Sequence, residues 1–135
     1  MQKVMVFGTF DIIHPGHISF LEQAKEYGDY LVVVVGRDIT VEQIKGSKPT
    51  NNENERLHNV ISLKIVDEAV LGKEDDKYQV IEDLKPNVIC IGYDQSSFTS
   101  ELQDEMLKRN VSVKIVKLKP YREEDFKSSK LQNKD

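Results

Sequence analysis

Two histidines near the N-terminus have the type and spacing to act on a phosphate group. The sequence GTFD at residues 8–11 ends an apolar run, and HPGH follows at residues 14–17. The chain has three histidines, so two of them stand in this one turn. If a helix begins there, its N-terminal dipole favours an anion by about 0.3–1 kcal/mol at an exposed site. The spacing therefore predicts a phosphate site at which imidazole donors follow charge as it develops.

The main chain around Gly8 can contribute to the same site. Gly8 would let the backbone pass close to a ligand, and the N–H groups of Thr9 and Phe10 could hold phosphate oxygens. Other interpretations stay open from residue types alone: the histidines can be ordinary caps or surface groups, and without a third nitrogen or sulfur ligand they are a weak zinc pattern. The dinucleotide pattern G-x-G-x-x-G and the P-loop pattern G-x-x-x-x-G-K-[ST] are both absent.

Five short apolar runs, rich in β-branched residues, are expected to form the strands that position these groups. They span residues 4–7, 31–35, 65–71, 88–91 and 111–116. The first, second and fourth are almost continuously apolar, which is typical of strands buried on both faces of a parallel sheet. Ligands of such sheets bind outside the carboxyl ends of the strands, which is where GTFD stands.

Helical patterns alternate with these strands. They cover residues 16–27, 76–84 and 99–110, and a further helix runs from the capping-box spacing of Thr50 and Glu53 to Lys64. The alternation predicts an α/β fold, a single Rossmann-like, doubly wound domain over residues 1–135 with a mainly parallel five-stranded sheet flanked by helices. Residues 46–52 are expected to form a polar loop, and residues 119–135 a charged tail or a short C-terminal helix.

The overall composition narrows the class of partner. The formal net charge is -4 and the basic residues are scattered, which argues against a nucleic-acid partner. One cysteine cannot form an internal disulfide, and no apolar run approaches the roughly 20 residues that span a bilayer. The first residues also lack the pattern of a secretory signal. We therefore expect a cytoplasmic protein that binds small molecules and neither nucleic acid nor membrane.

The motifs GTFD and HPGH, at this spacing after a first strand, resemble the signature of the cytidylyltransferase-like nucleotidyltransferases, the HxGH superfamily. Further matches extend the resemblance over most of the chain. They are GRD at 36–38, KGSKP at 45–49, Glu55-Arg56, VDE at 66–68 and GYDQ at 92–95. Taken together, these motifs are most similar to those of the small archaeal-type FAD synthases.

The resemblance implies transfer of AMP from ATP to FMN, which gives FAD and pyrophosphate. A phosphate oxygen of FMN would attack the α-phosphorus in line, without a covalent enzyme intermediate. ATP is then a co-substrate, and a divalent cation such as Mg²⁺ would be carried by the nucleotide, with no metal-ligand set of the protein. Catalysis would rest on positioning and on charge stabilisation.

The same resemblance implies roles for individual residues of the phosphate site. His14 and His17 would be catalytic and, with Pro15 and Gly16 between them, would bind the α- and β-phosphates. The backbone of Thr9 and Phe10 would hold triphosphate oxygens. Asp11 would either aid the metal and phosphate arrangement or fix its own loop through hydrogen bonds, and the two roles stay open.

Residues farther along the chain would complete the site by the same resemblance. Lys48 and Arg56 would be catalytic, and Lys45 stands in the same polar loop as Lys48. Asp94, after the fourth strand, would contact the nucleoside. The residues expected near the nucleotide in the tail are Tyr121, Ser128 and Ser129.

Alternative functions follow from the same superfamily and from outside it. The cytidylyltransferase stretch R-T-E-G-I-S-[ST] is replaced here by residues 121–129, YREEDFKSS, which argues against CTP and glycerol phosphate. A glycerol-3-phosphate cytidylyltransferase or a heptose-phosphate adenylyltransferase of lipopolysaccharide core synthesis is the alternative. A non-catalytic nucleotide-binding module ranks last, because it would not need both histidines. Small members of the superfamily often pair, so the resemblance is compatible with a homodimer.

Overall fold

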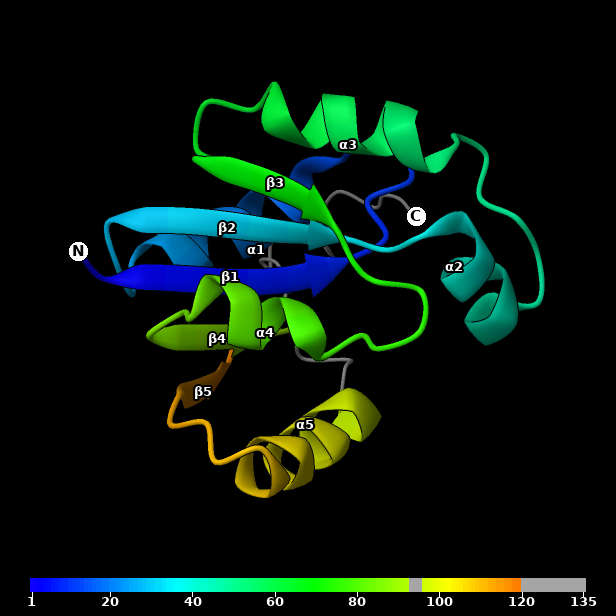
Figure 1. Cartoon of the computed structure of the whole chain (residues 1–135). Coiled ribbons are helices and arrows are strands. Elements are labelled where there is room, and N and C mark those ends of the chain that lie inside the picture. The colour runs from blue at the N-terminus through cyan, green and yellow to red at the C-terminus, as the bar shows by residue number, and fades with distance from the viewer. Residues whose placement is uncertain (93–95, 120–135) are drawn as a thin grey trace.

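Five parallel strands form one sheet in the order β3-β2-β1-β4-β5 (Figure 1). This computed structural model describes residues 1–92 and 96–119, without the side chains of 96–100. The strands are β1 (Lys3–Gly8), β2 (Tyr30–Val35), β3 (Glu68–Leu71), β4 (Val88–Ile91) and β5 (Lys114–Lys117). The chain winds outward from β1 to β3 and then returns to β4 on the other side of β1. The point where the winding reverses, between β1 and β4, is where open α/β sheets bind ligands.

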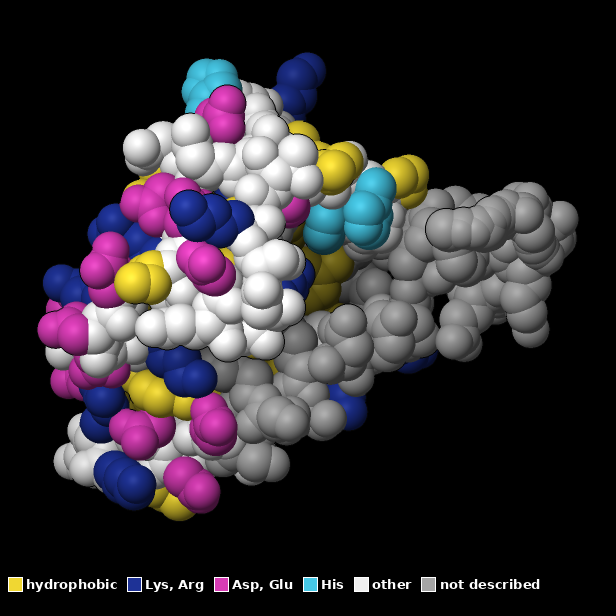
Figure 2. Space-filling view, turned by 90° about the vertical axis from the view of Figure 1, so that its right-hand side faces the viewer, with side chains coloured by type: hydrophobic (Ala, Val, Ile, Leu, Met, Phe, Trp, Pro, Cys, Tyr) yellow, Lys and Arg dark blue, Asp and Glu magenta, His cyan; other side chains and the backbone are white. Residues whose placement is uncertain are grey.

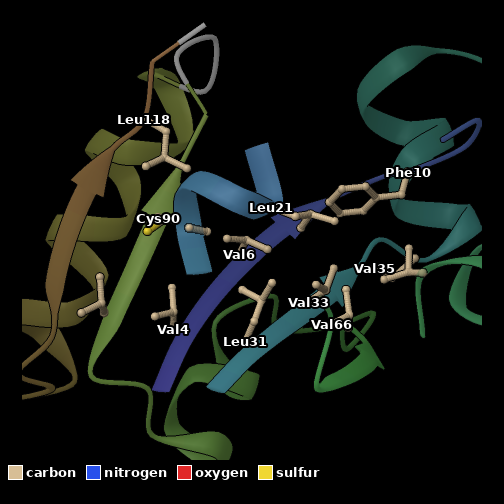
Figure 3. Close-up of a cluster of buried hydrophobic side chains, with 13 residues drawn as sticks. Val4, Val6, Phe10, Leu21, Leu31, Val33, Val35, Val66, Cys90 and Leu118 are labelled. Carbon is tan, nitrogen blue, oxygen red and sulfur yellow. The ribbon is translucent and has the colours of Figure 1, made fainter. Parts of the chain in front are cut away.

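Helices cover both faces of the sheet. The helices α1 (Pro15–Lys25) and α3 (Glu53–Ile61) pack on one face, and α4 (Gln79–Leu84) and α5 (Ser96–Lys108) pack on the other (Figure 1). Alternate residues of each strand point to opposite layers: Val4 and Val6 join the first core cluster, and Met5 joins the second. Figure 3 shows the first cluster, in which Leu21 of α1 lies against the buried valines of β1 and β2.

The structure confirms the predicted fold class and all five predicted strands. The strand predicted at 88–91 has the observed bounds, whereas β3 starts at residue 68 instead of 65 and β5 spans 114–117 instead of 111–116. The helices predicted at 16–27, 76–84 and 99–110 are observed as α1, α4 and α5 with ends shifted by at most three residues. No helix in the described part of the chain has the length and apolar character needed to cross a membrane.

Two local predictions were wrong. A helix, α2 (Asp38–Lys45), precedes the polar loop and was not predicted, because only Val41 of its residues is buried. The capping box of α3 is formed by Asn52 and Glu55, not by Thr50 and Glu53: the Asn52 Oδ1 accepts from the Glu55 N–H at 2.8 Å, and the Glu55 Oε1 accepts from the Asn52 N–H at 2.9 Å. The predicted tail helix lies outside the described residues.

Candidate active site

The candidate site lies at the carboxyl end of β1, where residues 9–14 connect the strand to α1. Figure 2 looks onto this edge of the sheet and shows two histidine side chains next to each other, while the third lies apart. The loop lies where the winding of the sheet reverses, at the carboxyl ends of β1 and β4. The HPGH motif is therefore brought to the place where a ligand of this fold binds.

His14 and His17 cap the first turn of α1 reciprocally. His14 is the N-cap residue, and its Nδ1 accepts a hydrogen bond from the Gly16 N–H at 3.0 Å. The Nδ1 of His17 accepts one from the His14 N–H at 3.3 Å. Pro15 occupies the first helical position, where its missing N–H costs nothing. The two imidazole rings stack, with centroids 3.9 Å apart and planes 21° from parallel.

These contacts set the chemical form of both histidines. A ring nitrogen that accepts a backbone hydrogen bond carries no proton, so the neutral ring carries its proton on Nε2. Each histidine can then donate one Nε2–H bond to a ligand. Burial first, and after it the neighbouring His14, lower the pKa of His17 from 6.5 to about 4. His17 is therefore a neutral donor at pH 7.

Phe10 adopts a left-handed backbone conformation, with φ of 52°, and its side chain is 3% exposed. Its ring folds back over the end of β1, where an added Cβ on Gly8 would lie 2.5 Å from the Phe10 Cε2. Gly8 thus makes room for this ring. Within the described residues, the N–H groups of Thr9 and Phe10 meet no protein acceptor, and they stay available for the phosphate oxygens predicted for them.

The carboxylate of Asp11 fastens this loop to the chain before α3. Its two oxygens accept hydrogen bonds from the N–H groups of Thr50 and Asn51 at 2.7 and 2.8 Å. The Asn51 side chain donates to the Asp11 carbonyl at 2.6 Å. The bond from the Asn51 N–H is the largest cause of the lowered pKa of Asp11. Of its two possible roles, the structure shows the loop-fixing one.

Arg56, which was predicted to be catalytic, is fully buried at 0% exposure. Its guanidinium donates to the Thr9 carbonyl at 2.8 Å, to the Asn51 carbonyl at 3.0 Å and to the Asp38 carboxylate at 2.6 Å. Burial raises the pKa of Asp38, but the bond from Arg56, the bond from the Glu53 N–H and the positive charges nearby together outweigh it, so the pKa is lowered. Arg56 therefore ties the loop after β1 to α2 and α3.

Reciprocal hydrogen bonds join the N-termini of α2 and α3. The Glu53 carboxylate accepts from the Asp38 N–H at 2.9 Å, and the Asp38 carboxylate accepts from the Glu53 N–H at 3.1 Å. Arg37 completes the cluster by donating to Glu53 at 3.1 Å. Asp38 belongs to the GRD motif at 36–38, for which the sequence predicted no role. Only a signal that paired it with residues 15 to 18 positions away could have revealed one.

The charges of the two lysines of the predicted site act on different groups. Lys45, the last residue of α2, is exposed, and after the larger effects given above its charge contributes to the lowered pKa values of Asp11 and His17. Lys48 is exposed too, and its charge acts on Asp38 instead. Four predicted site residues lie outside the described part of the chain: Asp94, Tyr121, Ser128 and Ser129.

Across residues 1–92 and 96–119, no cluster of three or more histidine, cysteine, aspartate or glutamate side chains is arranged to hold a metal ion. The free Cys90 is buried in β4, and burial raises its pKa to about 12, so its thiol is unreactive.

Comparison with known proteins assigns the class. The cytidylyltransferase-like family model matches residues 5–134, and the chain belongs to this family. A solved structure described as the lipopolysaccharide core biosynthesis protein from Thermoplasma volcanium has a TM-score of 0.84 at 45% identity, covering 90% of this chain and 98% of that one. Pantoate-beta-alanine ligase from Francisella tularensis, at 16% identity and a TM-score of 0.64 over 87% of this chain and 58% of that one, shares the fold alone.

Two curated relatives carry a more particular name. The FAD synthase of Aciduliprofundum boonei is 49% identical over 130 residues, which cover 96% of this chain and 87% of the relative. The FAD synthase of Ferroglobus placidus is 48% identical over 119 residues, which cover 88% of this chain and 77% of the relative. The chain is thus a nucleotidyltransferase whose similarity to FAD synthases extends over nearly its whole length.

Proposed function

We propose that this protein transfers AMP from ATP to FMN, giving FAD and pyrophosphate. The observation that carries the proposal is the pair of capped imidazoles at the start of α1, which offers two Nε2–H donors beside a helix N-terminus. The similarity to proteins named FAD synthase supports FMN as the acceptor. Five parallel strands with the switch point at β1 support a nucleotide lying across their carboxyl ends.

The reaction is a substitution at the α-phosphorus of ATP. A phosphate oxygen of FMN forms the new P–O bond, the bond to the bridging oxygen of the β-phosphate breaks, and that oxygen leaves with pyrophosphate. Negative charge grows on the leaving group, where His14 and His17 can donate without taking up a proton. The N–H groups of Thr9 and Phe10 would hold the triphosphate in place.

Other groups have supporting roles in this proposal. Lys45 at the end of α2 and Lys48 in the loop after it would approach the phosphates, and Asp94 would contact the nucleoside. Tyr121, Ser128 and Ser129 keep the roles near the nucleotide that the family resemblance implies. A divalent cation such as Mg²⁺, carried by the triphosphate, would screen its charge. A cytoplasmic location and a homodimer are further predictions of the resemblance.

The decisive measurement is pyrophosphate release by the purified protein with Mg²⁺. ATP and CTP are crossed with FMN, glycerol 3-phosphate and a heptose 1-phosphate. We expect release with ATP and FMN only. His14→Ala should slow this release about 10²–10³-fold, the usual effect of removing one well-placed donor. His58→Ala is the matched control, because His58 is an exposed histidine on α3 away from the site.

Each other outcome has a defined meaning. Turnover with CTP and glycerol 3-phosphate, or with ATP and the heptose phosphate, would keep the mechanism and replace the acceptor. Tight ATP binding without release from any pair would contradict the enzymatic proposal and favour a nucleotide-binding module. Equal rates for His14→Ala and His58→Ala would remove the imidazole pair from the mechanism.

A further inference from the structure

Phe10 combines a left-handed backbone with a buried side chain, and an ordinary loop residue needs neither. Its φ of 52° lies in the left-handed region, which is unfavourable for a bulky side chain. Lys85 and Asn110 are the other non-glycine residues with positive φ in the described part of the chain, and both of these side chains are exposed. The Phe10 side chain is buried instead, so the surrounding packing must hold the unfavourable backbone in place.

The Phe10 ring lies between the end of β1 and the first turn of α1. It occupies the place that a Cβ on Gly8 would take. Its centroid is 5.2 Å from that of His17, with the two ring planes tilted by 56°. The ring also lies near Phe20, which stands one turn after His17 on α1, at 6.4 Å between centroids. Figure 3 shows the ring beside Leu21, at the edge of the core cluster nearest the carboxyl end of β1. The ring therefore joins the hydrophobic core directly to an imidazole of the site.

His17 in turn contacts His14. Its Nδ1 accepts from the His14 N–H, and its ring stacks on that of His14 at 3.9 Å. A rotation of the His17 ring would therefore disturb both imidazoles. The left-handed backbone at Phe10 also fixes how the chain turns away from the N–H groups of Thr9 and Phe10, which meet no acceptor within the described residues. The Phe10 side chain thus contacts one imidazole directly and influences the other, within the loop that carries the backbone donors.

We propose that Phe10 is the positioning residue of the phosphate site, whose buried ring holds His17 in the donor orientation and shields it from water. The inference rests on the proposed function for its kinetic consequence, but the geometry it describes does not. The charged and polar groups that act on His17 are His14 on the same turn, Lys45 at the end of α2 and the Ile12 carbonyl. Burial is the largest single cause of the lowered pKa of His17, and the Phe10 ring lies beside this imidazole.

The test replaces the ring by a smaller apolar side chain. Phe10→Leu keeps the site apolar but opens space beside His17. Phe20→Leu is the matched control, because Phe20 is the other aromatic neighbour of the Phe10 ring and its ring contacts that of Phe10. We expect Phe10→Leu to lower kcat of pyrophosphate release from ATP and FMN about 10²-fold, with a much smaller change in KM. Phe20→Leu should keep the rate. Phe10→Met is made in parallel, in case the leucine variant does not fold.

A second readout separates positioning from stability. Imidazole resonances of His17 are followed by NMR against pH in the wild type and in both leucine variants. We expect the pKa of His17 to rise toward 6.5 in Phe10→Leu, because water reaches the ring, and to stay low in Phe20→Leu. Far-UV circular dichroism and thermal unfolding confirm that each variant is folded.

A folded Phe10→Leu protein with the wild-type His17 titration and the wild-type rate would overturn the proposal. Equal losses in Phe10→Leu and Phe20→Leu, or failure of both Phe10 variants to fold, would overturn it too, since the ring would then serve only the core. If the wild type releases no pyrophosphate from ATP and FMN, the proposed function fails. The NMR titration still decides whether Phe10 shields His17.

Discussion

Gly16 allows a substitution that should separate activity from stability. An added Cβ at this position would lie 2.8 Å from the Cε1 and 3.0 Å from the Nδ1 of His14. Both distances are too short for a Cβ contact, so in Gly16→Ala the His14 ring must swing away. The swing breaks the 3.0 Å bond from the Gly16 N–H to the His14 Nδ1 and the stacking on His17.

The two effects on stability oppose each other. Alanine is favoured over glycine in a helix by about 1 kcal/mol, an upper value so near the first turn. Loss of an N-cap side chain costs about 1 kcal/mol. The free energy of unfolding should therefore stay nearly constant. The rate has no such compensation, because the displaced Nε2–H is a donor to the leaving group, and its loss should lower kcat about 10²–10³-fold, or about 2.7–4 kcal/mol.

The assay compares Gly16→Ala, His14→Ala and the double variant by urea unfolding and by pyrophosphate release. If Gly16→Ala acts through His14, it should have almost no further effect on kcat in the His14→Ala background, because both variants remove the same interaction. A double variant whose loss is the product of the two single losses would refute the reasoning. So would a Gly16→Ala protein with the wild-type rate.

Three further predictions concern stability. Folded His17 stays neutral down to about pH 4 while the unfolded chain protonates near 6.5, so the free energy of unfolding should fall as pH drops through this window. His17→Gln should flatten the fall, and an unchanged slope would contradict the assignment. Asp11→Asn replaces one of two acceptor oxygens, so we expect a loss of about 1–2 kcal/mol and faster amide exchange at Thr50 and Asn51, and unchanged exchange would argue against the clamp. Arg109→Gln removes bonds to Glu82 of α4, Glu105 of α5 and Asp76 of the loop before α4. It should lower the midpoint of urea unfolding without changing the rate, and a variant of wild-type stability would disprove this.

The parts of the fold that follow from local pattern were predictable. The strand at 88–91 is apolar at every position because both of its faces are buried, so its bounds follow directly from the sequence. The start of α1 was nearly located for a similar reason. Its caps are His14 and His17, and Pro15 stands at the first helical position, so all the signals lie within four residues.

Features that depend on distant partners were not predictable. Only Val41 of α2 is buried, so the helix has no clear apolar stripe, and its N-terminus is held by Glu53, 15 residues away. The sequence around Arg56 is typical of an exposed arginine on a helix. In the structure its guanidinium donates to the carbonyls of Thr9 and Asn51. Charged side chains that cap or tie other elements leave no periodic pattern, and a single sequence contains no information about which partner they meet.

Both glycines of the signature are explained by neighbouring side chains. A Cβ on Gly8 would collide with the Phe10 ring, and a Cβ on Gly16 with the His14 ring. The residue types GxF and HxG therefore form two matched pairs, each with a ring folded back over its own glycine. Because the first ring contacts His17 and the second is itself a donor, steric exclusion at the glycines orients the imidazoles before a substrate binds. Donors oriented during folding need no reorganisation when charge develops, which is the condition under which neutral hydrogen bonds contribute most to catalysis.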